Sequence, residues 1–292
     1  MSEHPIRPVK ATPPSWGARE ARAMDGTTLL RRMVAACLAQ VRPNADAIAR
    51  GSDDPEHVHQ LRVGLRRLRS AAHGMQPFAD VLPHGWEATL APVFDALGAS
   101  RDHHVLATTL TPTLRRAGAP LAELGGASRE EARDVRARVR GAAFQRLLAQ
   151  LQQVADAPGS TDEPGAGLAH LVKQLRKLGR QVTHGAKEFD ALPFEAQHDV
   201  RKRLKRLRYL AEFAAPAFAR DDVKAWTAAA SATQDALGRH IDRALAAQRF
   251  ETLAAHDARA WFAVGWLRAR GGRSVKEARR SLRRLRDAKA FW

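Results

Sequence analysis

The chain has 292 residues, enough to bury one large hydrophobic core or two smaller ones. It carries 48 Lys and Arg against 31 Asp and Glu, a formal net charge of +17, so we expect an anionic partner such as nucleic acid or another polyanion. The single cysteine excludes a disulfide within the chain and fits a reducing compartment. No apolar run is long enough for a membrane-spanning helix, and no signal-peptide core is present, so we expect a cytoplasmic protein that is not held in a membrane.

The first half of the chain predicts a proline-rich arm followed by helices. Residues 1–24 contain four prolines and little apolar periodicity, which predicts a flexible N-terminal arm. Asp53 or Asp54 can cap a helix that has Pro55 in its first turn. Because the connections are short, the helices of this half should form one antiparallel bundle. Their predicted spans are about residues 27–43, 55–76, 84–97 and 101–116.

A long helix is then expected from Ser128 to about Asp156, and the Pro- and Gly-rich segment 158–167 is the clearest linker of the chain. Near the end, Gly271-Gly272 is expected to stop one helix and Ser274 to cap the last. No stretch alternates as a strand would, so the sequence predicts an all-α fold. The other helices of this half are expected around 171–182, between Pro193 and Pro216, and at about 221–238 and 240–257.

One stretch of the sequence occurs twice. Residues 59–69 read HQLRVGLRRLR and residues 198–208 read HDVRKRLKRLR. Both have a His, an Arg three residues later, a basic pair at seven and eight, and an Arg at ten. The copies are offset by 139 residues throughout.

A second motif follows each copy. The tetrad Asp-Ala-Leu-Gly at 95–98 recurs at 235–238, and Asp102 recurs as Asp242, both at an offset of 140 residues. Together with the first repeat, this series indicates an internal duplication. The sequence therefore predicts two pseudo-symmetric antiparallel four-helix bundles, the first at about residues 25–157 and the second at about 168–292, joined by the linker 158–167.

If the two copies form helices, each helix has two distinct faces. Each has an apolar face and, roughly 100° away, a row of cationic or protonatable side chains. We call these rows the first stripe and the second stripe. The first stripe is His59, Arg62, Arg66 and Arg69, and the second is His198, Arg201, Lys205 and Arg208.

A run of charge on a helix is most often a solvated face, but such faces usually mix signs. Here no Asp or Glu occurs between Glu56 and Asp80, or between Asp199 and Glu212. Cations one helical turn apart repel by a few tenths of a kcal/mol per pair. A chain that carries this cost twice is expected to offset it with an external anion, and we therefore interpret both stripes as binding surfaces.

These residues resemble the conserved histidine α-helical domain family, called CHAD. Its pattern is a helix of the type His-x-Leu-Arg-Val-x-x-Arg-Arg-x-Arg, present twice, with Leu-Gly followed by Asp in each half. The resemblance covers about residues 27–292, and we assign residues 25–292 to the domain. Lys205 departs from the pattern, because it keeps the charge of Arg66 but loses the planar fork. The matching segments are 59–69, 97–102, 198–208, 237–242 and 290–292.

The resemblance implies an all-helical protein of two related bundles that binds inorganic polyphosphate, in some members on polyphosphate granules. Arginine forks pair bidentately with phosphate oxygens, lysine acts as a point charge, and histidine becomes an imidazolium beside bound phosphate. We expect the two stripes to carry this binding. A second tier of candidates comprises Arg67, Arg206, Arg176, Arg180, Arg279 and Arg283.

Two other functions draw on the same residues. Non-specific nucleic-acid binding uses the same electrostatics, although the stripes lack the Asn side chains of base readers and the aromatic platforms of single-strand binders. A phosphohistidine signalling bundle is the second alternative, because His198 is followed by Asp199. His59 is instead followed by Gln60, and the chain has no nucleotide-binding motif of the usual kinds.

Catalysis is not expected from this sequence. Hydrolysis of phosphate bonds normally uses carboxylates to hold Mg²⁺, and the acids here are dispersed. The four repeated acids are better suited to cap helices or to pair with the arginines of the stripes. The spacing of the histidines does not fit a zinc site, so we expect no metal and no cofactor. The repeated acids are Asp95, Asp102, Asp235 and Asp242.

Overall fold

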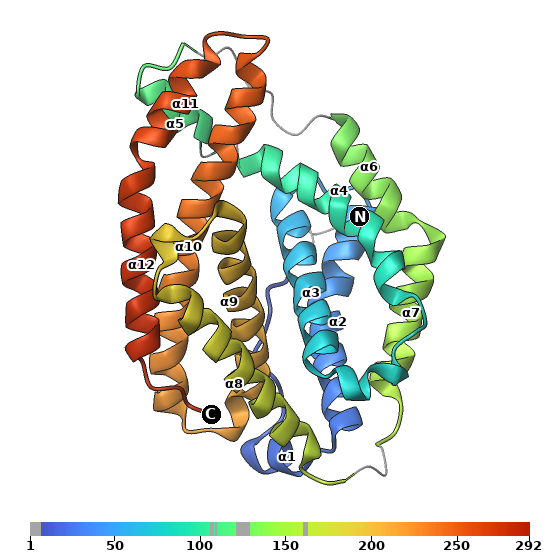
Figure 1. Cartoon of the computed structure of the whole chain (residues 1–292). Coiled ribbons are helices and arrows are strands. Elements are labelled where there is room, and N and C mark those ends of the chain that lie inside the picture. Colours follow the sequence, from blue (N-terminus) through green and yellow to red (C-terminus); the bar gives the residue numbers. More distant parts are fainter. Residues whose placement is uncertain (1–6, 106–107, 109, 121–128, 160–162) are drawn as a thin grey trace. The chain divides into compact units, whose positions relative to one another are not determined.

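The structure, a computed structural model, describes the chain except residues 1–6, 106–107, 109, 121–128 and 160–162 (Figure 1). Its described part is helical and contains no strand, which confirms the predicted all-α class. The chain divides into two compact units, described separately below. Unit 1 comprises Met1–Thr108 and Gly125–Leu171, and unit 2 comprises Thr109–Leu124 and Val172–Trp292. The predicted bundle boundaries and the duplication stay predictions.

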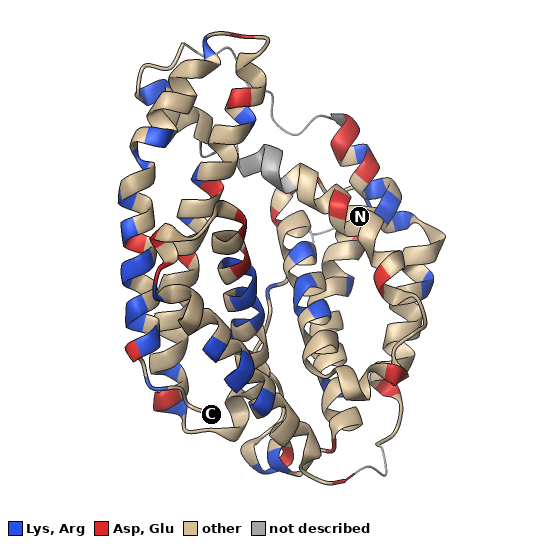
Figure 2. Cartoon of the chain, in the orientation of Figure 1, with Lys and Arg blue, Asp and Glu red and all other residues tan. Residues whose placement is uncertain are grey.

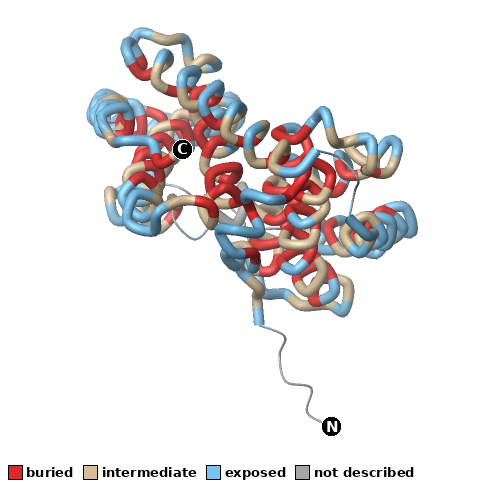
Figure 3. Tube along the Cα trace, turned by 90° about the horizontal axis from the view of Figure 1, so that it is seen from below, coloured by how far each residue is buried: buried red, intermediate tan, exposed pale blue. Residues whose placement is uncertain are grey.

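Unit 1 is built around α2, which packs against α3, α6 and α7. Helix α3 also packs against α4, and α4 packs against α6 and α7, so the apolar sides of these helices enclose one core. In Figure 3 the buried residues follow the inner sides of the helices. The elements are α1 (Ala18–Ala23), α2 (Gly26–Ala49), α3 (Pro55–Gly74), the 3-10 helix η1 (Gln76–Val81), α4 (Trp86–Val105), α6 (Arg129–Arg140) and α7 (Ala142–Asp156).

Unit 2 is built around α10, which packs against α9, α11 and α12. Helix α8 begins at the end of unit 1 and continues into unit 2, where it contacts α9. None of the described helices is long and apolar enough to cross a bilayer. The elements are α5 (Thr111–Arg116), α8 (Ala166–Ala186), η3 (Phe189–Ala191), α9 (Phe194–Ala214), η4 (Ala215–Ala217), α10 (Arg220–Ala254), α11 (Ala260–Ala269) and α12 (Gly271–Asp287).

The start of α3 follows its predicted signals. The carboxylate of Asp54 accepts a hydrogen bond from the backbone N–H of Glu56 at 2.8 Å, and Pro55 occupies the first helical position. This carboxylate satisfies one of the N–H groups that a helix leaves without a partner in its first turn. Helix α9 ends before Pro216, as predicted.

Several other helix ends were predicted wrongly. Helix α2 runs through Pro43, and the expected breaks near Gly98 and Gly238 fall inside the continuous helices α4 and α10. In α2 and α10 the buried apolar positions keep the same helical phase on both sides of the Pro or Gly, so packing outweighs a local cost of about 1 kcal/mol for Gly and about 3 kcal/mol for Pro. Conversely, the expected long helix up to Asp156 is divided into α6 and α7 at Gly141.

Two further assignments need correction or lie outside the described residues. Gly271 and Gly272 form the first turn of α12, and Ser274 lies inside that helix, where its hydroxyl donates to the Gly271 carbonyl at 2.8 Å. The linker is shorter than predicted, because α8 already begins at Ala166. Ser128, the expected start of a helix, lies outside the described residues.

The segment 7–24, expected to be a flexible arm, is anchored on unit 1. The N–H of Val9 donates to Oδ1 of Asn44 at 3.2 Å, and Nδ2 of Asn44 donates back to the Val9 carbonyl at 2.8 Å. Trp16 is 4% exposed, and α1 follows it. Proline content alone predicted flexibility here, but the arm is held by a side chain of α2 and by burial of an indole.

Glycines set how closely two helix pairs approach. A Cβ at Gly64 of α3 would lie 2.7 Å from Cγ2 of Val41 on α2, and a Cβ at Gly185 of α8 would lie 2.6 Å from Cγ2 of Val200 on α9. Both valines are buried and have little room to move. Each glycine therefore permits a close approach of two helices, which any side chain at that position would force apart.

We expect Gly64→Ala to lower the free energy of unfolding by about 1–3 kcal/mol, because the added methyl overpacks a filled interface. Urea denaturation followed by circular dichroism measures this. The matched control is Gly272→Ala in α12, where a Cβ meets nothing within 4 Å and stability should be equal or slightly higher. Equal stability of Gly64→Ala and the unmodified protein would contradict the proposed contact.

Candidate functional site

The two stripes lie on α3 and α9, each beside the buried side of its helix. On α3 the buried side includes Leu61, Leu65 and Leu68, each at most 1% exposed. On α9 it includes Val200, Leu204 and Leu207, each at most 2% exposed. The stripe residues are half-buried or exposed. Figure 2 shows basic residues along both helices. The predicted geometry of an apolar face flanked by a basic row is thus present in both units.

The arginines of the first stripe are gathered over one aromatic ring. The guanidinium carbons of Arg62, Arg66 and Arg69 lie 5.5, 5.7 and 5.6 Å from the ring centroid of Phe94, which is on α4. Cations within about 6 Å of a ring face are attracted to it. The ring therefore holds three like charges close together, at a place where they would otherwise repel one another.

Glu87, also on α4, closes one end of the first stripe. Its Oε1 lies 3.1 Å from a guanidinium nitrogen of Arg69 and 2.9 Å from Nε2 of His73. Burial raises the pKa of Glu87, but His73 and Arg69 outweigh this effect, and the pKa lies below its ordinary value. Both side chains of the Arg69–Glu87 pair are more than 40% exposed, so solvent weakens the interaction and a ligand can compete for Arg69.

In the second stripe, carboxylates from the repeated motif and from α9 itself hold the arginines. Arg201 donates to Oδ1 of Asp242 at 2.9 Å, which confirms the expectation that this repeated acid pairs with a stripe arginine. Arg208 donates to Oε1 of Gln234 at 3.0 Å and forms an ion pair with Glu212 at 2.9 Å. The side chain of Asp102, the counterpart of Asp242, lies outside the described residues.

The repeated Leu-Gly motif faces the first arginine of each stripe. A Cβ at Gly98 would lie 3.5 Å from a terminal guanidinium nitrogen of Arg62, and a Cβ at Gly238 would lie 3.7 Å from the same nitrogen of Arg201. In both units the guanidinium therefore rests on helix backbone that carries no side chain. Both distances are ordinary van der Waals contacts, so each arginine packs directly against this part of the neighbouring helix.

The stripes are not free of internal counter-charges, contrary to the expectation from the local sequence. Glu87 and Asp242 come from neighbouring helices, and Glu212 comes from one turn further along α9. Asp242 was among the repeated acids expected to pair with the stripes, but inspection of the residues near each stripe could not find Glu87, which reaches the first stripe only through helix packing. Glu87 lies against Arg69, Asp242 against Arg201 and Glu212 against Arg208, whereas Arg66 has no carboxylate within 4 Å among the described residues.

His198 lies among cations. Burial lowers the pKa of His198 below its ordinary value of 6.5, and the positive charges of Lys202 and Arg201 lower it further. Glu195 and Asp199 raise this pKa, but by less, and Asp199 is itself paired with Lys202 at 2.7 Å. The neutral form of His198 is therefore favoured near pH 7 in the unliganded protein.

The second-tier candidates occupy different environments. Arg67 is 1% exposed and donates to Oε1 of Gln40 at 3.1 Å between α3 and α2, so it is a core residue and we remove it from the candidate site. Its counterpart Arg206 is exposed, as are Arg176, Arg180 and Arg283. Arg279 forms an ion pair with Asp190 at 2.5 Å, which partly neutralises it.

Three residues of the site were missed. Phe94 and Gln234 are 140 positions apart, like the glycines, but an aromatic and an amide share no pattern that would identify them. Both nevertheless hold stripe arginines, from equivalent places on α4 and α10. Glu87 has no acidic counterpart, since Thr227 occupies the position 140 residues later.

The sequence and fold were compared with known proteins. No curated protein matches the chain. The crystal structure of the CHAD domain from the plant Ricinus communis is similar, with 24% sequence identity, a TM-score of 0.74, and coverage of 97% of this chain and 99% of that one. The model of the CHAD domain family matches residues 32–251. The chain therefore belongs to the CHAD domain family.

Proposed function

We propose that this protein binds inorganic polyphosphate without catalysing its breakdown, through the first and second stripes. The observation that supports this most strongly is the fixation of guanidinium groups in both units. Arg62, Arg66 and Arg69 are held over Phe94, and Arg201 is held between Gly238 and Asp242. Preorganised cations lose little conformational entropy when a ligand binds, so more of the interaction energy appears as affinity.

The dimensions and chemistry of the stripes suit a long inorganic polyanion. The ten-residue span of a stripe corresponds to about 15 Å of helix axis at 1.5 Å per residue. A flexible chain with about one negative charge per phosphate can follow such a row without base-specific contacts. Arginine pairs with phosphate oxygens bidentately, and the half-exposed carboxylates of Glu87 and Asp242 can be displaced at little cost. The polyphosphate association that the family resemblance implies agrees with this proposal, and we extend it to the surface of polyphosphate granules in the cytoplasm.

The double charge reversal Arg62→Glu and Arg201→Glu should lower polyphosphate affinity by about a hundredfold or more, because it replaces a charge-assisted contact by repulsion in each unit. Isothermal titration calorimetry with long-chain polyphosphate measures this, and circular dichroism should show unchanged helicity. Incubation of the unmodified protein with polyphosphate and Mg²⁺ should release no phosphate.

The control for this variant is the double reversal Arg146→Glu and Arg203→Glu. It has the same net charge and changes exposed arginines of α7 and α9 that lie off the stripes. Its affinity should stay within a few-fold of the unmodified protein. If both double variants lose affinity equally, net charge accounts for the binding and the stripes are not its site.

Competition separates this proposal from nucleic-acid binding. At equal phosphate concentration, long-chain polyphosphate should displace a fluorescent DNA duplex, since the stripes present no groups for base edges or base stacking. By analogy with duplex DNA, the logarithm of affinity should fall with the logarithm of salt with a slope near −0.9 per phosphate neutralised. Displacement of polyphosphate by DNA would favour the nucleic-acid function.

Lowering the pH should decrease the stability of the free protein but increase its affinity for polyphosphate. Because the pKa of folded His198 lies below the unfolded value of about 6.5, its neutral form contributes stability above that pH, and this contribution is lost as the pH falls from about 6.5 through the folded pKa. Bound phosphate should raise the pKa of His198, so affinity should increase over the same pH range. NMR titration of the His198 ring with and without polyphosphate measures both. An unchanged pKa in the complex would place the phosphates away from His198.

A further inference from the structure

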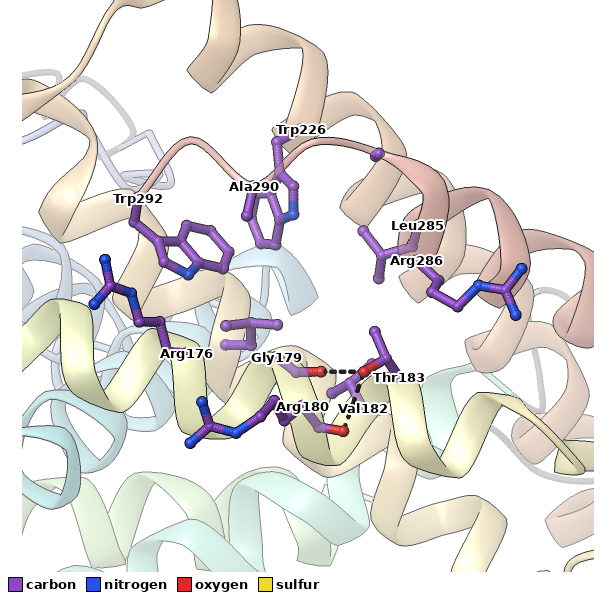
Figure 4. Close-up of a pocket in the computed structure, with 12 residues that line it drawn as sticks. Arg176, Gly179, Arg180, Val182, Thr183, Trp226, Leu285, Arg286, Ala290 and Trp292 are labelled. Atoms are coloured by element: carbon purple, nitrogen blue, oxygen red, sulfur yellow. Dashed lines mark hydrogen bonds between the residues drawn. The ribbon is translucent and has the colours of Figure 1, made fainter.

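Unit 2 contains a cavity of about 320 Å³ that belongs to neither stripe (Figure 4). It lies between α8, α9, α10, α12 and the C-terminal segment. Its apolar lining includes Val182, Leu207 and Leu285, each at most 5% exposed, so the cavity reaches the hydrophobic core of the unit. Small-molecule sites are concave and mostly apolar, with a few polar groups, and usually start at about 300 Å³.

Two indole side chains form one wall of this cavity. The rings of Trp226 and Trp292 meet edge to face with centroids 4.7 Å apart, and Phe291 contacts both. Trp292 lies over α8 at Gly179, where a Cβ would be 3.8 Å from its Cζ2. The ring positions are therefore fixed by packing on three sides, while Trp292 stays partly exposed.

Guanidinium groups border the same cavity. Arg176 and Arg180 lie one turn apart on α8, both exposed, and neither has a carboxylate within 4 Å in the described part of the chain. In Figure 4 they lie on the side of Trp292, and Arg286 lies on the opposite side. Arg286 pairs with the adjacent Asp287 at 3.0 Å, an exposed interaction of little strength.

One hydroxyl adds a polar group to the lining. Oγ1 of Thr183 donates to the carbonyls of Gly179 and Arg180, at 3.0 and 3.1 Å. Since its proton is directed at the backbone, its lone pairs can accept a hydrogen bond from an N–H group of a ligand. The cavity thus combines aromatic faces, an acceptor and nearby cations.

We propose that this cavity binds a nucleotide, with the base against Trp292 and the phosphates at Arg176 and Arg180. An inorganic phosphate chain has no apolar surface and would gain nothing from the indoles or the aliphatic lining. A neutral aromatic compound would leave the guanidinium groups unused. A nucleoside phosphate uses both, because aromatic side chains stack on any base and arginine pairs with phosphate. The volume suits one nucleoside rather than a longer oligonucleotide.

Calorimetry on the full chain, at constant ionic strength and without Mg²⁺, tests the proposal with ATP and inorganic tripolyphosphate as probes. ATP should bind about tenfold more tightly, since base stacking alone contributes a factor of about this size. Trp292→Leu, which keeps an apolar side chain but removes the aromatic face, should bring the two affinities together. Ala290→Trp, which adds bulk at the exposed edge of the cavity, should do the same.

Long-chain polyphosphate, measured on the same samples, distinguishes this proposal from the proposed function. Neither Trp292→Leu nor Ala290→Trp should alter its affinity, and the Arg62→Glu and Arg201→Glu variant should keep its preference for ATP. Equal affinities of the unmodified protein for ATP and tripolyphosphate would overturn the nucleotide site. So would a preference for ATP that survives both cavity variants, and neither result would bear on polyphosphate binding by the stripes.

Discussion

The site depends on keeping positive charges next to one another without an anion bound. In unit 1 the face of Phe94 attracts three guanidinium groups, and in unit 2 Asp242, Gln234 and Glu212 hold two. The groups that hold the arginines differ in chemistry between the two units, but they lie at equivalent places. Helix α4 approaches α3, and α10 approaches α9, at the glycine of a Leu-Gly pair. Mutual repulsion would otherwise turn these side chains outward, and a ligand would then have to order them.

Internal acids do not cancel this surface. A carboxylate buried with its arginine would remove a cation from use, but Glu87 and Asp242 are each more than 40% exposed and contact the stripes from one side. Such pairs are worth about 0–1 kcal/mol. Under the proposed function, they are supports that hold the guanidinium groups until a phosphate replaces them. The histidine of the second stripe acts in the same sense, since its neutral state limits the charge of the empty surface.

The sequence was sufficient for those features that depend on local order. The helical class, the start of α3 at Asp54 and Pro55, the apolar and basic faces of α3 and α9, and the Arg201–Asp242 pair could all be predicted. Features that depend on packing could not. From the sequence alone Gly238 predicts a helix end, and only the structure shows that the buried residues on both sides of it lie on one helical face. In the same way, Arg67 looks like part of the basic row, and only the structure shows that it is buried beside Gln40. Phe94 had no local signal, because its role exists only when α3 and α4 meet.

The attachment of Val9 to Asn44 has a consequence for any shortened form of the protein. The Asn44 amide also donates to the Gln40 carbonyl, and its Oδ1 lies 3.0 Å from Nδ1 of His57, so one side chain connects the N-terminal segment to α2 and α3. A chain trimmed to begin at residue 25 would retain every helix from α2 onward. It would, however, lose the two hydrogen bonds between Val9 and Asn44 and expose the surface that Trp16 buries. The proline-rich segment 7–24 is thus an integral part of the folded unit 1, although much of it is not helical.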